Sequence, residues 1–481
     1  MDRTDKYKTL LNNTFLISIG TFGSKLLSFF MVRFYTGVLT PTDYGTADLI
    51  VQTANLLFPL ISMGITESVF RFALNDPIGR KNVFSVGTAA ISAGALVLTA
   101  VSPFLSGIPS FGETMWLVAL YTIASCYHSL CAQFIRAQGK TALFAGQGVL
   151  NTALVIGMNI LFLAVFQWGI TGYICSIVFA DLLCSLYLVW KEKLWRYITF
   201  HPERQAFRLM LRYSVPLIPT TVFWWITSVS DRYMITAFLG SDANGLYAVA
   251  CKIPTLISLV SGIFLEAWHF SAISEAGKAR GEQARFFSQI WSAFLAVMFL
   301  AGSVIIAFSQ WEIRLLSDPS YHEAWRYIPM LSAAMIFSAF VTFMGSVYVV
   351  EKRSLLSFWT AMAGAGLNLL LNALLIPSDM ADMGVQGAAI ATMLSYLVVF
   401  LLRAKNARAL IPFRLYKKRL LGSFAILCAQ IWAAIDMPTG WQVMQGGALL
   451  LILAVNGKAF GSSALRTEGL LSGNLKRRKR E

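Results

Sequence analysis

Long apolar stretches alternate with short polar loops along almost the whole chain, and positive charge is confined to every second loop. Fourteen stretches approach or exceed the roughly 20 apolar residues that cross a bilayer as a helix. We expect these spans at 11–34, 45–70, 82–107, 112–135, 143–166, 169–190, 213–238, 245–270, 286–308, 327–350, 354–376, 384–402, 419–436 and 441–457. Nearly all of the 39 Lys and Arg residues lie in the two tails and in alternate loops or at their edges. Because cytoplasmic loops retain positive charge, both termini are expected in the cytoplasm.

The composition excludes a soluble globular protein, since 57% of the residues are hydrophobic and 13% are charged. The residues that give the net charge of +15 lie mainly in the loops expected in the cytoplasm, beside the membrane surface. We therefore expect membrane lipids and no nucleic acid as partners. None of the six cysteines belongs to a CxxC pair, which leaves no sequence basis for a metal or disulfide site. The first span is too long for a cleaved signal sequence, so we expect a multi-pass protein of the bacterial inner membrane that retains it.

A shift of 200 residues aligns the first two spans with the seventh and eighth spans without a gap. The identical pairs include Thr21/Thr221, Ser28/Ser228, Thr36/Thr236, Leu39/Leu239, Gly45/Gly245 and Leu56/Leu256. Six spans separate the copies, so both start on the same side and form parallel repeats about an axis normal to the membrane. The predicted fold is an all-α membrane protein of two six-helix lobes with two further C-terminal helices.

The expected domain boundaries follow from this repeat. Residues 1–198 form an N-terminal lobe, 199–212 an amphipathic cytoplasmic linker, 213–408 a C-terminal lobe, and 409–481 two extra helices with a basic tail. Such a duplication is typical of alternating-access transporters, which bind substrate between their halves. The expected external loops are short except for 309–326. This disfavours a glycan polymerase or ligase, which needs an external domain to hold its catalytic residues.

Four cations lie inside the expected spans, where each costs roughly 2.5–3.5 kcal/mol at the bilayer centre. They are Lys25 and Arg33 in the first lobe, and Arg232 and Lys252 in the second lobe. Because ionisable residues at this depth face a bundle interior or a water-filled cavity, we predict that the four line one central cavity. Snorkelling to the membrane surface is the alternative for Lys25 and Arg33.

Acidic residues inside the spans are candidates for coupling to H⁺ or Na⁺. Asp181 in the sixth span has no charged neighbour in sequence, whereas Asp231 stands beside Arg232 and is interpreted first as its local ion-pair partner. Asp48 is expected to cap the start of the second span. We interpret His128 as a packing residue, and a proton relay is the alternative. No other cofactor is predicted.

Prolines mark candidate hinges. Pro216 and Pro219 at the mouth of the seventh span and Pro254 in the eighth remove backbone donors and are expected to bend these helices. Catalytic motifs are missing from the sequence. The run GKT at 139–141 resembles the end of a phosphate-binding loop, but Phe134 occupies the place of the required first glycine. We therefore predict a protein that is not an enzyme.

Several segments carry recognisable motifs, namely Arg33–Leu49, Arg136–Lys140, Pro216–Pro219, Asp231–Gly240, Gly245–Ala250 and Lys252–Pro254. These segments resemble polysaccharide exporters of the multidrug/oligosaccharidyl-lipid/polysaccharide (MOP) flippase superfamily, over about residues 8–405. The resemblance implies a MATE-like fold. It also implies a Wzx-type flippase that moves undecaprenyl-diphosphate-linked oligosaccharide to the outer leaflet, for cell-surface polysaccharides such as O-antigen or capsule.

In this resemblance Lys25, Arg33, Arg232 and Lys252 bind the diphosphate through charge-assisted contacts, while the prenyl chain stays in lipid. A glycan polymerase and other assembly proteins are the implied partners. The alternatives on the same scaffold are an exporter of lipid II and a multidrug exporter that exchanges its cargo for a cation. Multidrug exporters of this fold carry cationic cargo and rely on acidic cavities, so cations in the spans favour the anionic cargo. No motif specifies the glycan.

Overall fold

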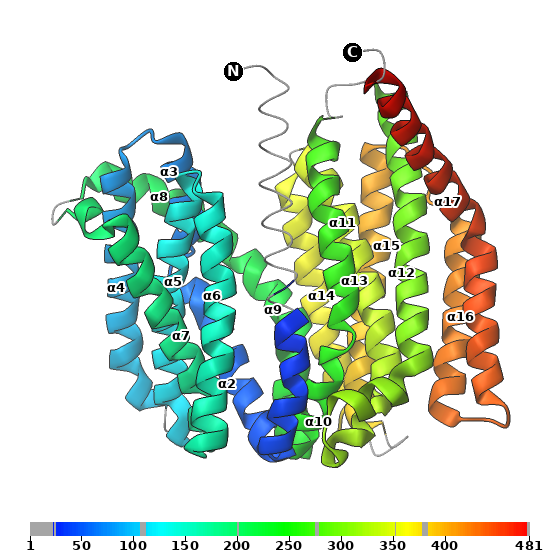
Figure 1. Cartoon of the computed structure of the whole chain (residues 1–481), viewed down its shortest axis with the longest axis horizontal. Coiled ribbons are helices and arrows are strands. Elements are labelled where there is room, and N and C mark those ends of the chain that lie inside the picture. Colours follow the sequence, from blue (N-terminus) through cyan, green and yellow to red (C-terminus); the bar gives the residue numbers. More distant parts are fainter. Residues whose placement is uncertain are drawn as a thin grey trace. The chain divides into compact units, whose positions relative to one another are not determined.

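A computed structural model describes residues 23, 26–105, 112–199, 202–274, 279–351, 353–377 and 383–478. Over these residues the chain is helical and has no strand (Figure 1). In this part of the chain ten helices are long and apolar enough to cross a membrane, and one bent pair adds an eleventh. Every expected span from 45–70 onward overlaps a helix, whereas the first expected span lies mostly outside the described residues. The prediction of an all-α, multi-pass fold is confirmed.

The helices form two compact units. Unit 1 comprises Met1–Ala248 and Leu316–Ser320, and unit 2 comprises Val249–Leu315 and Tyr321–Glu481. Unit 1 holds a short helix Leu26–Val38, α2 (Pro41–Ile61), α3 (Ile65–Asn75), α4 (Arg80–Leu105), η1 (Gly112–Thr114), α5 (Met115–Ala137), α6 (Thr141–Asn159), η2 (Ile160–Val165), α7 (Gly169–Glu192), η3 (Leu194–Tyr197), α8 (Arg204–Ser214), η4 (Val215–Leu217) and α9 (Ile218–Leu239). α10 (Ser241–Lys252) crosses the boundary between the units. The four-part division expected from the sequence repeat stays a prediction.

Unit 2 contains the remaining elements. They are α11 (Thr255–Ser274), α12 (Arg280–Leu316), η5 (Pro319–Arg326), α13 (Ile328–Val350), α14 (Ser354–Leu375), α15 (Gly384–Leu410), α16 (Lys417–Asp436) and α17 (Trp441–Arg478). Buried polar side chains join α16 to α12. Ser303 Oγ donates to Gln430 Oε1 at 2.7 Å, and Gln430 Nε2 donates back to the Ser303 carbonyl at 2.9 Å. Arg419 Nη1 donates to Ser292 Oγ at 2.6 Å. The first extra helix is therefore fastened to unit 2 by polar contacts as well as by apolar packing.

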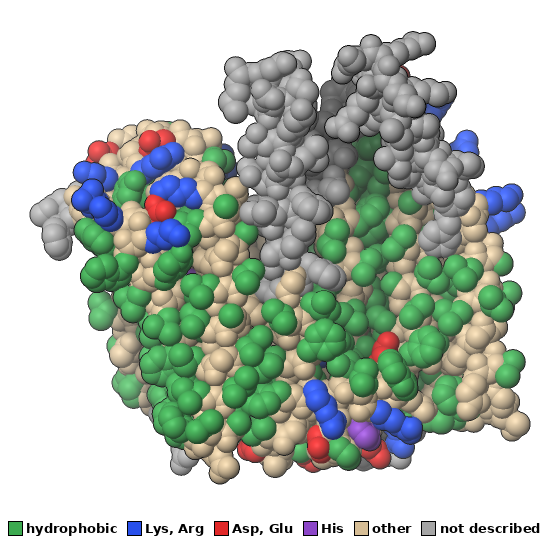
Figure 2. Space-filling view, viewed as in Figure 1, with side chains coloured by type: hydrophobic (Ala, Val, Ile, Leu, Met, Phe, Trp, Pro, Cys, Tyr) green, Lys and Arg blue, Asp and Glu red, His purple; other side chains and the backbone are tan. Residues whose placement is uncertain are grey.

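Two apolar clusters form the core of unit 1. One lies where α3, α4, α5 and α8 meet and includes Phe84, Phe134 and Met210. The other lies among α2, α5 and α7 and includes Leu117 and Ile174. Large hydrophobic side chains also cover the outward faces of the helices between the charged ends (Figure 2). An apolar exterior of this kind is what a helix bundle presents to lipid.

Several expected spans are broken, and the prolines lie at or near the breaks. The second expected span is the pair α2 and α3, bent by 52°, with Pro59 inside the last turn of α2. Pro216 lies in the short turn η4, and Pro219 lies in the first turn of α9, where a missing donor costs nothing. These two prolines therefore lie where α8 ends and α9 begins, and not in the interior of α9; their role as a hinge stays a prediction. Pro254 separates α10 from α11.

α2 and α10 cross closely at two glycines that the shift of 200 residues pairs. A β-carbon on Gly45 would lie 2.0 Å from the Ser241 carbonyl oxygen, and one on Gly245 would lie 1.9 Å from the Pro41 carbonyl oxygen. Pro41 and Ser241 are related by the same shift. The two copies therefore contact each other through equivalent positions, as in a twofold-symmetric interface. Glycine is required at both places because the backbones approach so closely.

Candidate functional site

An ion pair between α2 and α9 lies inside unit 1. Arg232 Nη1 donates to both carboxylate oxygens of Asp48, at 2.7 and 2.6 Å. The two side chains are only 12% and 5% exposed, so water screens their attraction little. Asp48 lies about 10 Å along α2 from its first residue, and Arg232 lies about 10 Å along α9 from its last residue. Both of these helix ends lie near the α2–α10 crossing. A charge enclosed at this depth is tolerated because it has an opposite charge as its partner.

The start of α2 explains why Asp48 is available to Arg232. The Thr40 hydroxyl accepts a hydrogen bond from the Asp43 amide at 3.2 Å, and the Asp43 carboxylate accepts one from the Thr40 amide at 3.4 Å. This capping box starts the helix at Pro41. The expectation that Asp48 caps the helix is therefore wrong. Asp48 lies two turns further on, where its carboxylate reaches across to α9.

Asp231 lies beside this pair and is 2% exposed. Its Oδ1 accepts a hydrogen bond from the Arg232 backbone amide at 2.9 Å, and its Oδ2 accepts a short one from the Tyr247 hydroxyl. Tyr233, the residue after Arg232, shares a hydrogen bond of 2.6 Å with Thr53 on α2. α2, α9 and α10 are thus joined by polar side chains of three adjacent residues of α9.

Arg33 lies on the helix Leu26–Val38 and is exposed. Its guanidinium donates to the backbone carbonyl of Ser317, and the Asp318 amide donates to Thr36 Oγ1 at 3.1 Å. These contacts attach the segment Leu316–Ser320 to unit 1. A carbonyl oxygen satisfies a donor without neutralising its charge, so Arg33 keeps its attraction for an anion.

The structure does not place the other two predicted cations relative to Arg232. Lys252 is the last residue of α10, is partly buried and belongs to unit 2. Lys25 lies outside the described residues. One cavity shared by the four cations therefore stays a prediction.

A second polar cluster lies among α5, α6 and α7. Asp181 is 6% exposed. Its Oδ2 accepts a hydrogen bond from Ser125 Oγ at 2.5 Å, and its Oδ1 accepts one from Asn151 Nδ2 at 2.8 Å. His128 Nδ1 lies 3.1 Å from Asp181 Oδ1, and His128 Nε2 lies 2.7 Å from Gln147 Oε1. Three neighbouring helices each contribute to the cluster, so it depends on how unit 1 is packed.

The ring of His128 stands between two oxygen atoms. A neutral imidazole donates from one nitrogen only, so both contacts are hydrogen bonds when the ring or the carboxyl group carries an additional proton. A role of this pair in proton coupling stays a prediction. His128 has a polar partner at each ring nitrogen, which agrees with a histidine that is satisfied inside the bundle.

Cations gather at the end of unit 1 where α3 and α8 lie (Figure 2). They are Arg71, Arg80, Lys81, Arg136, Lys140, Lys191, Lys193, Arg196, Arg204, Arg208 and Arg212. The opposite end, where α2 and α10 begin, carries Asp43 and Asp242. This asymmetry within a single unit is the structural counterpart of the alternating charge of the loops.

Arg403 in unit 2 is a buried charge that the sequence did not indicate. It is 4% exposed and donates to Thr360 Oγ1 at 3.0 Å, to the Val341 carbonyl at 3.1 Å and to Ser357 Oγ at 3.2 Å. The residue follows the last position of the expected span 384–402, but α15 continues beyond it. Hydropathy alone ended the expected span one residue before Arg403. Allowing the helix to extend beyond the apolar stretch would have placed Arg403 within it.

Comparisons with known proteins give a family and a fold. The family model described as polysaccharide biosynthesis protein matches residues 10–269. No curated protein matches the sequence. A structure of the lipid II flippase MurJ in an inward closed conformation has a TM-score of 0.72 at 14% identity, and the match covers 94% of this chain and 100% of that chain.

Two structures of multidrug resistance MATE family transporters of the MOP superfamily are also similar. The inward-facing one has a TM-score of 0.62 at 15% identity, covering 81% of this chain and 95% of its own. The outward-facing one has a TM-score of 0.56 at 15% identity, covering 84% and 96%. At these identities the likeness shows the fold. The MATE-like fold prediction is confirmed.

Proposed function

Because the chain belongs to the polysaccharide biosynthesis protein family, we propose that it is an alternating-access flippase for undecaprenyl-diphosphate-linked oligosaccharide. The MurJ- and MATE-like fold supplies the architecture of a transporter. The protein works in the bacterial inner membrane with both termini in the cytoplasm, because positive charge is retained on that side. It delivers oligosaccharide units to the outer leaflet for cell-surface polysaccharides such as O-antigen or capsule.

The observation that carries the proposal is the enclosed pair of Arg232 and Asp48. Nη1 of Arg232 makes charge-assisted hydrogen bonds to both oxygens of the Asp48 carboxylate, and a phosphate oxygen is an equally suitable acceptor for a guanidinium. An arriving diphosphate takes the place of the Asp48 carboxylate, so the positive charge is never left without an anion. Binding is then an exchange of partners, which avoids the cost of exposing a bare charge inside the membrane.

The remaining cations complete the proposed diphosphate site. Arg33 has its guanidinium on a neutral carbonyl, and Lys25 and Lys252 add two further charges. The prenyl chain stays in lipid along the apolar faces of the helices. Membrane lipids surround the protein, and a glycan polymerase and other polysaccharide-assembly proteins receive the product.

The cluster of Asp181 and His128 supports coupling to protons. Its carboxylate and ring share a proton position among neutral hydrogen-bond donors. Asp231 is the second candidate, because its enclosed carboxylate lies next to Arg232. Pro216 and Pro219 at the start of α9 and Pro254 between α10 and α11 are the proposed hinges of the transport cycle.

The coupling is tested with Asp181→Asn in vesicles that hold a pH gradient. Asparagine keeps the size of the side chain and removes the titratable carboxyl group. We expect the rate of flipping by the parent protein to fall severalfold when the gradient is dissipated. The rate of flipping by the variant should not depend on the gradient. Parent flipping that does not depend on the gradient would show downhill movement, driven by consumption of the product outside.

The diphosphate site is tested in cells by replacing Lys25, Arg33, Arg232 and Lys252 together with glutamine. We expect polysaccharide export to stop while the protein is still inserted in the membrane. Arg232→Gln leaves the buried Asp48 without the guanidinium that it contacts, which destabilises the protein. A second variant therefore changes only Arg33 and Lys252, and it should reduce export without loss of protein. Normal export by both variants would end the proposal for these residues. Expulsion of a cationic dye without sugar export would favour a multidrug exporter.

A further inference from the structure

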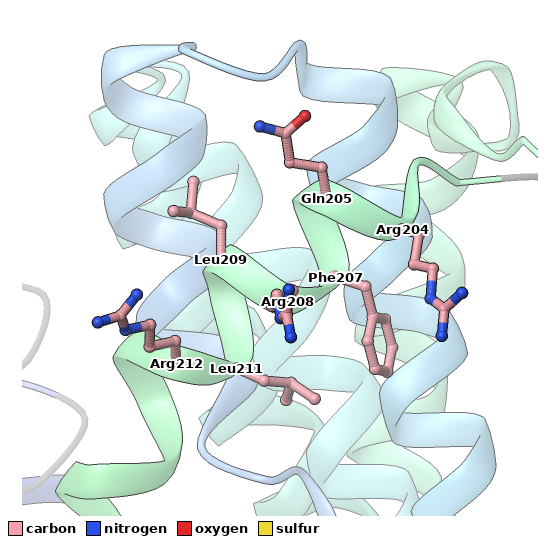
Figure 3. A pocket seen from close by; sticks show the side chains of 7 residues that line it. All are labelled: Arg204, Gln205, Phe207, Arg208, Leu209, Leu211 and Arg212. Carbon is pink, nitrogen blue, oxygen red and sulfur yellow. The ribbon is translucent and has the colours of Figure 1, made fainter.

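Unit 1 carries a second group of arginines that the proposed transport site does not use. Arg204, Arg208 and Arg212 lie along α8 and line a cavity of about 1280 Å³, whose described lining comes from this helix alone. Figure 3 shows Arg204 and Arg212 towards opposite ends of the helix with Arg208 between them. A spacing of four residues places neighbours about 6 Å apart along the helix axis. The three side chains form an exposed row, which we call the arginine ladder.

The other face of α8 holds the ladder in place. Ala206 and Met210 are fully buried, and Met210 belongs to the core shared with α3 and α5. Ser68 Oγ on α3 donates to the Met210 carbonyl at 2.7 Å, and Ser214 Oγ donates to the Met63 carbonyl at 2.8 Å. The apolar face of this amphipathic helix is thus committed to protein. It cannot at the same time lie on lipid, so the arginines are turned outward from the unit.

The ladder is electrostatically unfavourable by itself. Like charges four residues apart on a helix repel each other. Within the part of the chain that the structure describes, no carboxylate forms an ion pair with Arg204, Arg208 or Arg212. At the same end of the unit, Lys140 does have such a partner, Glu192. The arrangement therefore leaves three guanidinium groups ready for an external anion.

We propose that the arginine ladder binds the diphosphate headgroup of the lipid-linked oligosaccharide on the cytoplasmic side, before the lipid reaches Arg232. This inference rests on the proposed function and adds an earlier binding step to it. Two neighbouring guanidinium groups can each contact one phosphate through paired hydrogen bonds, which a single point charge cannot do.

The apolar side chains beside the ladder suit the lipid end of this ligand. Leu209 is exposed and Leu211 is partly buried, and they lie on either side of the ladder on the helix surface. They give the first isoprene units an apolar contact. The combined chemistry is that of a prenyl diphosphate.

The test uses full-length protein in nanodiscs of phosphatidylcholine and farnesyl diphosphate as a soluble probe, with binding measured by titration calorimetry. The variant R204Q/R208Q/R212Q should bind at least about tenfold more weakly, because several charge-assisted bonds are lost. The matched control K81Q/K193Q/R196Q removes three exposed cations from the same end of unit 1 and should bind within about twofold of the parent. Thermal unfolding of all three proteins checks that they are folded.

The outcomes separate the two proposals. Equal affinity of the parent and the ladder variant contradicts the ladder and leaves the proposed function standing. A parent protein that binds no farnesyl diphosphate contradicts both. A third arm replaces one fifth of the phosphatidylcholine by phosphatidylglycerol. If this monophosphate lipid abolishes probe binding, the ladder is a contact for ordinary anionic lipid and the inference is wrong; retained binding supports the diphosphate.

Discussion

Unit 1 uses arginine in two opposite ways. Arg232 is enclosed and donates to both oxygens of the Asp48 carboxylate. The arginines of the ladder on α8 are exposed and have no described carboxylate partner. An enclosed pair contributes to the fold and gives up its anion only to a competing anion. An exposed ladder contributes nothing to the core and is available to a ligand from the start.

The difference has a consequence for the order of binding. In the proposed function, a diphosphate meets the ladder without displacing any group of the protein, whereas it meets Arg232 only by replacing Asp48. We therefore propose that the more accessible contact with the ladder comes first and that the exchange at Arg232 comes second. Loss of the enclosed pair should damage the folded protein, and loss of the ladder should damage binding alone.

The largest effect is expected for breaking the enclosed pair. Asp48→Asn or Arg232→Gln alone should lower the free energy of unfolding by about 3–5 kcal/mol, because each leaves a buried charge uncompensated. The double variant should recover part of that loss. A double-mutant cycle on thermal or denaturant unfolding measures the coupling. Single variants as stable as the parent would show that the pair is not a structural element, and the comparison with the ladder would fail.

The close crossing of α2 and α10 also supports the enclosed pair, because α2 carries Asp48. Gly45→Ala places a β-carbon against the Ser241 backbone and should cost about 1–3 kcal/mol. Gly157→Ala on α6 is the matched control, because no atom lies within 4 Å of its β-carbon position. It should be neutral or slightly stabilising. Equal melting temperatures for the two variants would argue against a tight crossing.

The smallest effect is expected for changing the chemistry of the ladder while keeping its charge. R204K/R208K/R212K should leave the melting temperature unchanged and weaken farnesyl diphosphate binding by about two- to fivefold, because lysine is a point charge without the planar fork. The comparison is made by calorimetry beside the glutamine variant. Full affinity of the lysine variant would mean that charge alone suffices and that paired hydrogen bonds play no part.

The fold was largely predictable, because hydropathy and loop charge depend on short stretches of sequence. The contacts of the site were not, because Asp48 meets Arg232 through a packing of α2 on α9 that no local pattern encodes. His128 and Asp181 meet across α5 and α7 for the same reason. The basic linker on α8 was visible in the sequence, but its attachment through Met210 was not. Only the assembled helices show which cations have an anion beside them.

Transbilayer movement of the lipid itself tests the central claim most directly. Purified protein is placed in liposomes with undecaprenyl-diphosphate-linked oligosaccharide, and the sugar that becomes accessible to an external lectin is followed with time. The account predicts rapid movement by the parent protein, slow movement by the ladder variant, and none by the variant that lacks Lys25, Arg33, Arg232 and Lys252. Movement by the parent no faster than in protein-free liposomes would contradict it.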